Sequence, residues 1–133
     1  MRSFQLEIVT PDGLEFSGQA ESALLRTTEG DVEILAGHAD FLAALGIGRA
    51  RIIIGGESKL ASLAGGFVLV KDGAVKVVAT TFEFSDDIDL ARAESAKARA
   101  EDQIKAAKGK DDLKLAEARL KRALNRINVK TAR

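Results

Sequence analysis

The chain has 133 residues, and its 20 Lys and Arg balance its 20 Asp and Glu, so the formal net charge is zero. This length suits one domain or one domain with a small appendage, and zero charge gives no whole-chain argument for nucleic acid or an anionic membrane. The lack of cysteine excludes disulfides, iron–sulfur clusters and thiol catalysis, and a single histidine argues against a His-based zinc site. No apolar run approaches the roughly 20 residues of a membrane span, and no signal-peptide core opens the sequence, so we expect a cytosolic protein.

Composition changes sharply after Phe84. Residues 1–84 contain 7 Lys/Arg and 11 Asp/Glu, a net charge of −4, whereas residues 85–133 contain 13 and 9, a net charge of +4. All six Phe and 11 of the 12 Gly lie before this point, and Ala, Lys, Arg and Glu dominate after it. Such a shift marks a structural boundary. We therefore predict two domains, residues 1–84 and 85–133, joined without a long linker.

The first domain is predicted to consist of strands. Phe4, Leu6 and Ile8 alternate with polar residues, which is the period of a half-buried strand. Gly55-Gly56 and Asp72-Gly73 separate apolar runs and predict hairpin turns, because such turns need positive φ angles. Short strands with close turns and no helical period predict an all-β sandwich or barrel. The remaining apolar runs, all but the last followed within three residues by glycine, lie at 20–28, 32–35, 50–54, 60–64, 67–70 and 75–82.

The second domain is predicted to be an antiparallel hairpin of two helices. Asp87 is expected to cap the first helix, which is expected to end at Lys108-Gly109-Lys110, with Gly109 as its C-cap. Asp111 or Asp112 is expected to cap the second helix. The apolar stripes, at spacings of three and four, are Leu90, Ala93, Ala96, Ala100, Ile104 and Ala107, then Leu113, Ala116, Leu120, Ala123 and Ile127. Alanine buries little area, so this hairpin is predicted to be weakly held; a rigid helical cap on the sandwich is the alternative.

Enzyme chemistry has little support in the sequence. A dyad of His38 and Asp40 is conceivable, but a lone histidine beside Gly37 is more often a turn residue. Gly46-Ile47-Gly48 begins like a dinucleotide fingerprint, yet the final glycine is missing and a strand follows. We find neither a nucleophile elbow nor a Walker A motif. We therefore predict a non-catalytic chain with no catalytic or metal-binding residues.

Arginines recur on both predicted helices. Arg92 and Arg99 are seven residues apart on one face of the first helix, and Arg119, Arg122 and Arg126 are three and four apart on the second. Converging guanidinium groups suit a polyphosphate, because they bind phosphate oxygens bidentately. Spacing alone nevertheless favours the ordinary interpretation, in which these are solvated surface arginines paired with Asp and Glu.

An ordered set of motifs runs through both domains. They are Val9-Thr10-Pro11-Asp12-Gly13, Glu33-Ile34-Leu35-Ala36-Gly37-His38, Ala64-Gly65-Gly66-Phe67, Asp87-Ile88-Asp89 and Arg122-Ala123-Leu124-Asn125-Arg126. In this order the chain resembles the epsilon-subunit family of bacterial rotary (F-type) ATP synthase over nearly its whole length. Two positions depart from the family, which usually has proline at Ala36 and often arginine at Phe84. The resemblance implies a mainly β plus α protein: an N-terminal two-sheet β-sandwich followed by a C-terminal antiparallel two-helix hairpin.

The resemblance also implies a function. Members of the family are non-catalytic central-stalk rotor subunits that couple proton-driven rotation to ATP synthesis. The sandwich docks on the gamma subunit and the c-ring, which implies a peripheral location on the cytoplasmic face of a bacterial cell membrane. The resemblance implies that the hairpin regulates ATP hydrolysis. The folded hairpin permits hydrolysis, and the hairpin that extends into the alpha/beta catalytic head inhibits it.

In some bacterial members the folded hairpin binds ATP through the pattern Ile/Leu-Asp-x-x-Arg-Ala, which residues 88–93 match in full. The resemblance therefore implies ATP as a regulatory ligand, with no prosthetic group, and makes the arginine cluster a predicted phosphate site. The predicted ATP-binding residues are Glu83, Ile88, Asp89, Arg92, Ala93, Arg99, Arg122 and Arg126.

Two other function classes stay open. The chain is alternatively a freestanding nucleotide-sensing adaptor module, which co-purification with gamma would argue against. The basic hairpin is alternatively a nucleic-acid binder. No aromatic residue follows Phe84 to stack on bases, so we predict no nucleic-acid partner.

Overall fold

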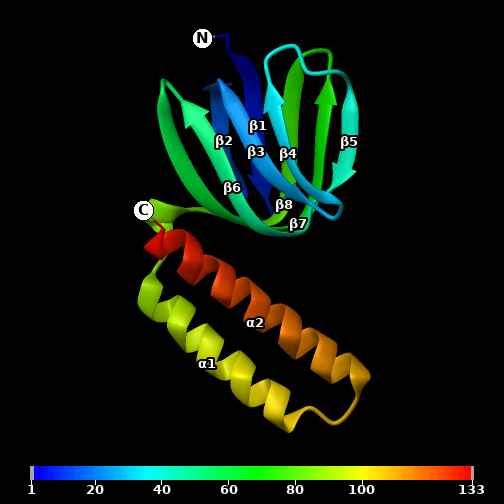
Figure 1. Ribbon diagram of the computed structural model, residues 1–133, viewed down its shortest axis with the longest axis vertical. Coiled ribbons are helices and arrows are strands. Elements are labelled where there is room, and N and C mark those ends of the chain that lie inside the picture. The colour runs from blue at the N-terminus through cyan, green and yellow to red at the C-terminus, as the bar shows by residue number, and fades with distance from the viewer. Residues whose placement is uncertain (1, 133) are drawn as a thin grey trace. The chain divides into compact units, whose positions relative to one another are not determined.

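The computed structural model describes residues 2–132, and the chain divides into two compact units between Phe84 and Ser85. The first unit contains only strands and the second only helices (Figure 1). The fold is therefore mainly β plus α, as predicted. The strands are β1 (Phe4–Thr10), β2 (Gly13–Ala20), β3 (Ser22–Thr27), β4 (Gly30–Leu35), β5 (Phe41–Ala44), β6 (Ile47–Ile54), β7 (Glu57–Lys71) and β8 (Ala74–Phe84).

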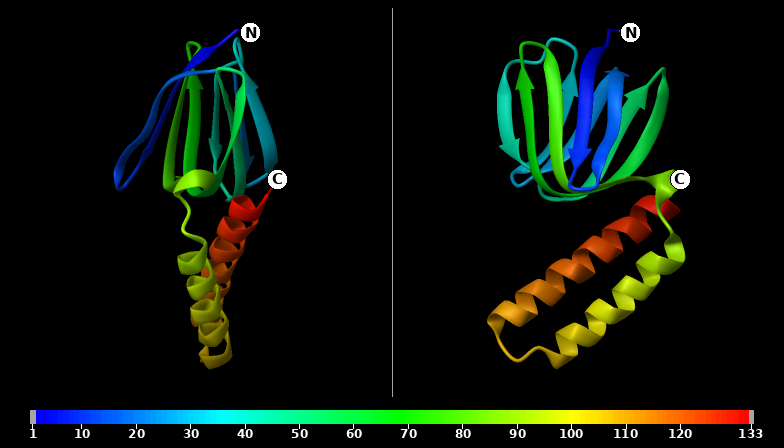
Figure 2. Two further views of the ribbon diagram at one scale, coloured as in Figure 1. Left: turned by 90° about the vertical axis from the view of Figure 1, so that its left-hand side faces the viewer. Right: turned by 180° about the vertical axis from the view of Figure 1, so that it is seen from behind.

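The strands form two facing layers, which the side view in Figure 2 separates. Hydrogen bonds connect them as one sheet in the order β2-β1-β8-β7-β6-β3-β4, with β5 paired to β7. β7 belongs to both layers: its residues 57–64 pair with β6, and its residues 67–70 pair with β5. All neighbouring pairs are antiparallel except β1 and β8, which run parallel. The two-sheet sandwich is thus built by one long strand that both layers share.

Gly65 and Gly66 allow β7 to pass between the layers. Their φ angles are +68° and +101°, in the left-handed region that favours glycine. A Cβ placed on Gly66 would lie 1.9 Å from the carbonyl oxygen of Val78 on β8. We predicted separate strands at 60–64 and 67–70 because glycine usually ends a run; that prediction was wrong, because here the two glycines continue the strand through a close backbone crossing.

Both predicted hairpin turns are confirmed. Gly55-Gly56 joins β6 to β7 with φ angles of +58° and +81°, and Asp72-Gly73 joins β7 to β8 with +51° and +81°. These pairs of positive φ angles are those of a type I′ turn. Glu21 supports the first turn, because its Oε2 accepts a hydrogen bond from the Gly56 backbone N–H at 3.0 Å. The sequence patterns did not predict β2 and β5.

The core lies between the two layers. Phe4, Leu6 and Ile8 are buried, so the predicted alternation of β1 is confirmed. Side chains from both layers complete the core, and Phe84 packs partly buried against it with its ring edge-on to Phe82 at 5.2 Å between centroids. The largest fully buried side chains of this unit are Leu6, Ile8, Leu25, Ile34, Ile52, Leu63, Val68, Val70 and Val77.

The second unit contains a short 3-10 turn, η1 (Ser85–Asp87), and two helices, α1 (Leu90–Ala106) and α2 (Lys110–Thr131). The three predicted caps were wrong. Asp87 lies in η1, and the cap of α1 is Asp89, whose Oδ1 accepts a hydrogen bond from the Arg92 N–H at 3.1 Å. Gly109 begins α2 in an extended conformation, with φ −173°, rather than ending α1. Because Gly109 is the N-cap, Asp111 and Asp112 lie in the first turn of α2. Their negative charges there interact favourably with the helix dipole.

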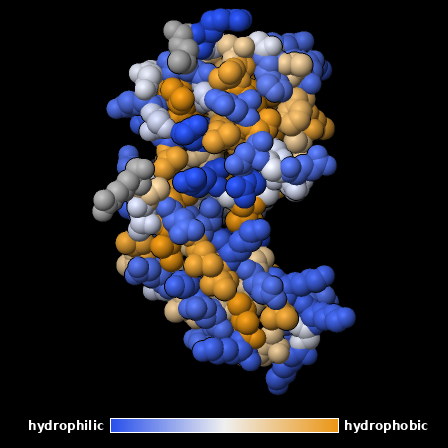
Figure 3. All heavy atoms as spheres, viewed as in Figure 1, coloured by the Kyte–Doolittle hydropathy of each residue, from blue (hydrophilic) through white to orange (hydrophobic). Residues whose placement is uncertain are grey.

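The helices pack along an alanine seam. Ala93 and Ala100 of α1 and Ala116 and Ala123 of α2 are buried, as the stripes predicted. Leu113 was predicted in the apolar stripe of α2, but it is exposed, and so are Leu115 and Leu124. Figure 3 shows hydrophobic side chains along α2 among hydrophilic ones. A seam of methyl groups allows close approach but buries little apolar area.

The two ends of the hairpin are also hydrogen-bonded to each other. Ser85 Oγ donates to the Val129 carbonyl at 3.4 Å, and Lys130 Nζ donates to the Ser85 carbonyl at 3.0 Å. The start of this unit is therefore held to the last turn of α2. The bond from the Ser85 hydroxyl contributes about 1 kcal/mol, and the bond from the charged Lys130 side chain about 1.5–3 kcal/mol.

Candidate functional site

A pocket of about 270 Å³ opens between the two helices. Each helix contributes side chains at spacings of three and four residues, so each presents one face to the pocket. Small alanines lie among the larger residues and leave the space that the pocket occupies. The lining residues are Ala96, Arg99, Ala100, Gln103, Arg119, Arg122, Ala123 and Arg126.

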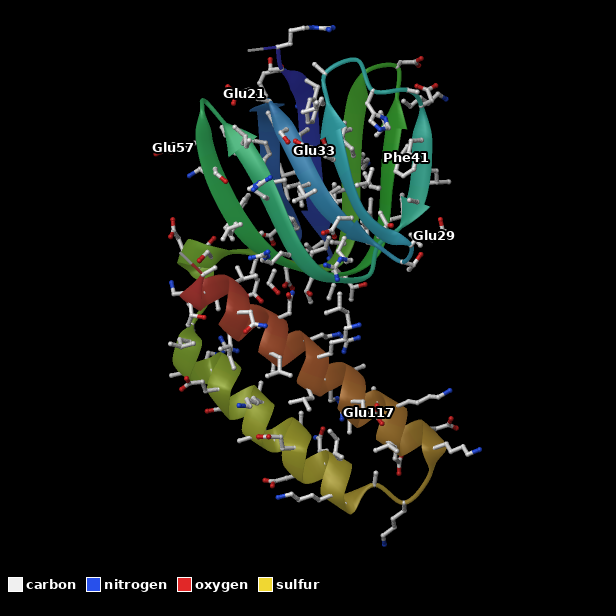
Figure 4. The ribbon with its side chains drawn as sticks, viewed as in Figure 1. Glu21, Glu29, Glu33, Phe41, Glu57 and Glu117 are labelled. Carbon is white, nitrogen blue, oxygen red and sulfur yellow. The ribbon has the colours of Figure 1, made fainter. Side chains whose placement is uncertain are left out.

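Every charged residue that lines the pocket is an arginine. Arg119 Nη1 donates a hydrogen bond to Gln103 Oε1 at 3.1 Å, so its partner is a neutral amide from the other helix. Within residues 2–132, neither Arg99 nor Arg122 forms an ion pair. The pairs Arg26–Asp31, Lys59–Glu57 and Lys76–Glu7 lie in the sandwich. Glu117, labelled on α2 in Figure 4, is not part of the lining. The ordinary interpretation of surface arginines paired with carboxylates therefore does not describe Arg99, Arg119 or Arg122.

Three of the predicted ATP-binding residues, Arg99, Arg122 and Arg126, meet in this pocket. Arg92 lies one helical turn before Ala96 on the same face of α1, just beyond the lining. Asp89 lies at the start of that helix, where one carboxylate oxygen caps α1. These residues thus follow one edge of the hairpin in the order Asp89, Arg92, Arg99.

The other three predicted residues lie elsewhere. Ile88 is buried, 3% exposed, between η1 and α1, and Ala93 belongs to the alanine seam. Glu83 belongs to the other unit, on β8 in register with Ser62 of β7. Arg119 and Gln103 line the pocket but were absent from the predicted site. The spacing of Arg119 from Arg122 and Arg126 was the available signal, whereas nothing in the sequence singled out Gln103.

The conceivable dyad of His38 and Asp40 is not formed. His38 Nδ1 donates to the Ala39 carbonyl at 2.7 Å, and its ring meets that of Phe41, on β5 in Figure 4, edge-on at 5.6 Å. Asp40 Oδ1 instead accepts a hydrogen bond from the Asp72 N–H at 3.0 Å and so supports the β7–β8 turn. Among residues 2–132, no group of His, Cys, Asp and Glu is arranged to hold a metal ion. The charged side chains that line the pocket between the helices are all cationic, which suits an anionic ligand.

The chain matches two family models that together cover almost all of it. The ATP synthase delta/epsilon chain beta-sandwich domain matches residues 3–85, and the long alpha-helix domain of the same chain matches residues 86–131. The chain belongs to the ATP synthase delta/epsilon family. Among curated members, the ATP synthase epsilon chain of Ruminococcus albus is 43% identical over 130 residues and that of Bacillus pumilus 42% over 129, each alignment covering at least 97% of both chains. Epsilon chains are non-catalytic, as predicted.

Chains in two solved mitochondrial ATP synthase structures have the same fold. A chain of the Euglena gracilis mitochondrial ATP synthase (OSCP/F1/c-ring) superposes with a TM-score of 0.75 at 22% identity, covering 90% of this chain and 76% of that one. A chain of the Tetrahymena thermophila mitochondrial ATP synthase central stalk/c-ring superposes with a TM-score of 0.64 at 15% identity, covering 96% of both chains. Because each superposition covers at least 90% of this chain, the shared fold includes both the sandwich and the hairpin. No helix in residues 2–132 is long and apolar enough to span a membrane.

Proposed function

We propose that this epsilon-family chain is a rotor subunit in the central stalk of a bacterial ATP synthase. Its sandwich docks on gamma and the c-ring, couples proton-driven rotation to ATP synthesis, and lies peripherally on the cytoplasmic face of the cell membrane. Support comes from full-length similarity to bacterial epsilon chains and from the fold shared with a chain of a central stalk/c-ring structure. The freestanding adaptor module is the alternative to this proposal.

We further propose that the hairpin regulates ATP hydrolysis. Its alanine seam and few end-to-end hydrogen bonds make the folded form easy to open, and its net charge of +4 suits acidic surfaces of the alpha/beta catalytic head. Leucines on α2 offer apolar contacts to such a partner when the hairpin extends. The folded form permits hydrolysis and the extended form blocks it.

The folded hairpin is proposed to bind ATP, and the observation that carries this step is the arginine-lined pocket. Bringing four cationic side chains together is unfavourable until a polyphosphate neutralises them, so ATP favours the folded form. Asp89 accepts a hydrogen bond from the exocyclic amine of adenine through the oxygen that does not cap the helix. Coupling is reciprocal: any contact that holds the hairpin extended weakens ATP binding by the same factor.

Residues 1–84 alone are expected to fold and to bind gamma. They contain the whole sandwich core and form a compact unit, so removal of the hairpin takes away none of their strand pairing. Gel filtration of this fragment with cognate gamma measures the complex, with residues 1–84 alone as the reference. A folded fragment that does not co-elute with gamma contradicts the docking role and restores the adaptor hypothesis.

Deleting residues 88–133 is expected to raise ATP hydrolysis severalfold in the assembled enzyme while leaving ATP synthesis largely intact. The sandwich that couples rotation stays in place, and the segment proposed to enter the catalytic head is gone. Hydrolysis and synthesis are measured on membrane vesicles that carry either the intact or the shortened subunit in equal amounts. Equal hydrolysis rates, under conditions where the intact subunit inhibits, would remove the hairpin from the mechanism.

A further inference from the structure

We propose that Arg119, oriented by Gln103, contacts the terminal phosphate of a bound nucleoside triphosphate and makes the pocket prefer triphosphates to diphosphates. The inference rests on the proposed ATP site and adds a specificity residue to it. Neither residue belongs to the pattern that predicted the site, and both line the pocket.

The order of residues along the hairpin supports this assignment. The bond from Arg119 to Gln103 shows that these two positions face each other, so in the antiparallel hairpin positions whose numbers sum to about 222 lie opposite each other. Arg126 then lies opposite the region of Ala96, Arg122 opposite the region of Arg99, and Arg119 opposite Gln103. Starting from Asp89, Arg119 is the last arginine of the pocket that a ligand reaches.

The face of α1 from Asp89 to Gln103 is long enough for a nucleotide whose base lies at Asp89 and whose phosphates extend toward Gln103. At 1.5 Å per residue, Arg99 lies about 15 Å along α1 from Asp89, and Gln103 about 21 Å. A nucleotide whose base contacts Asp89 therefore places its first phosphates near the middle arginines. Each added phosphate extends toward the pair of Gln103 and Arg119.

The bond with Gln103 orients Arg119 without neutralising it. A guanidinium group has five N–H donors, and the amide oxygen accepts one of them. The charge and the other donors stay available to phosphate oxygens, whereas a carboxylate partner would compete with the ligand. Arg119 is exposed, so it can bind a phosphate without first breaking a buried contact.

The test measures ATP, ADP and AMP binding to the full chain by calorimetry. Arg119→Gln is expected to weaken ATP binding about tenfold, which corresponds to about 1.4 kcal/mol, and ADP binding less than about twofold, because only ATP has the terminal phosphate that Arg119 contacts. Gln103→Ala leaves the charge in place and is expected to cause a smaller loss, again confined to ATP. Lys121→Gln is the matched control, because it removes one exposed positive charge from α2 outside the pocket.

Distinct outcomes separate the two proposals. A parent chain that binds none of the nucleotides overturns the proposed ATP site, and this inference with it. A parent that binds ATP, combined with equal losses of ATP and ADP in Arg119→Gln, overturns this inference alone, because it makes the bond to Gln103 a structural link between the helices. A loss in Lys121→Gln as large as that in Arg119→Gln also overturns it, since general charge then accounts for the effect.

Discussion

Replacing Gly66 by alanine is expected to lower the free energy of unfolding of the sandwich by about 3–5 kcal/mol. The added Cβ would lie 1.9 Å from the Val78 carbonyl oxygen and 2.8 Å from the Ala79 Cα. Both are backbone atoms of the paired strand, so no side chain can turn aside to make room. The φ of +101° adds strain that alanine tolerates poorly. Chemical denaturation of the full chain, followed by far-UV circular dichroism of the strands, measures the change.

Gly73→Ala is the matched control for this effect. Gly73 also has a positive φ, +81°, but nothing lies within 4 Å of its added Cβ. Gly73→Ala is expected to lower the free energy of unfolding by only about 1 kcal/mol, which is the cost of the backbone conformation alone. The difference between the two variants isolates the close approach of β7 to β8. Similar losses in both variants would show that the crossing at Gly66 is less tight than the structure describes.

Replacing Asp89 by asparagine is expected to lower the ratio of ATP to GTP affinity by about tenfold or more. The cap orients the new side chain: because the Arg92 N–H needs an acceptor, the amide oxygen takes that bond. The amide NH2 then faces the nucleotide in place of the second carboxylate oxygen. A donor there opposes the exocyclic amine of adenine and matches the carbonyl of guanine. Calorimetric titration with both nucleotides measures the ratio.

This substitution separates nucleotide recognition from helix capping. Asparagine caps helices about as well as aspartate, so the helical circular dichroism of the variant should equal that of the parent. Arg126→Ala is the companion variant: it removes a phosphate contact and should weaken ATP and GTP by the same factor. An unchanged ratio in Asp89→Asn, together with intact helicity, would mean that Asp89 only caps α1 and does not contact the base.

Local patterns predicted elements whose physical cause is local. Alternation identified β1, and the pairs Gly55-Gly56 and Asp72-Gly73 identified two turns, because positive φ angles depend on the residues themselves. The predictions of the helix caps were wrong because the choice of cap is not local. Several acidic residues near each start are equally good caps by type, and only the folded backbone shows that Asp89 accepts the Arg92 N–H.

The sequence by itself determined the class of protein, a strand-rich part followed by a basic helical part, because composition and period depend only on the order of residues. It also supplied the arginines of the candidate site. Tertiary structure alone decided that β7 runs through Gly65-Gly66 into both layers, since strand pairing joins residues that are distant in the chain. It likewise decided that Arg119 faces Gln103 across the pocket, because the register between two helices is set by the packing of their alanine seam and not by either helix alone.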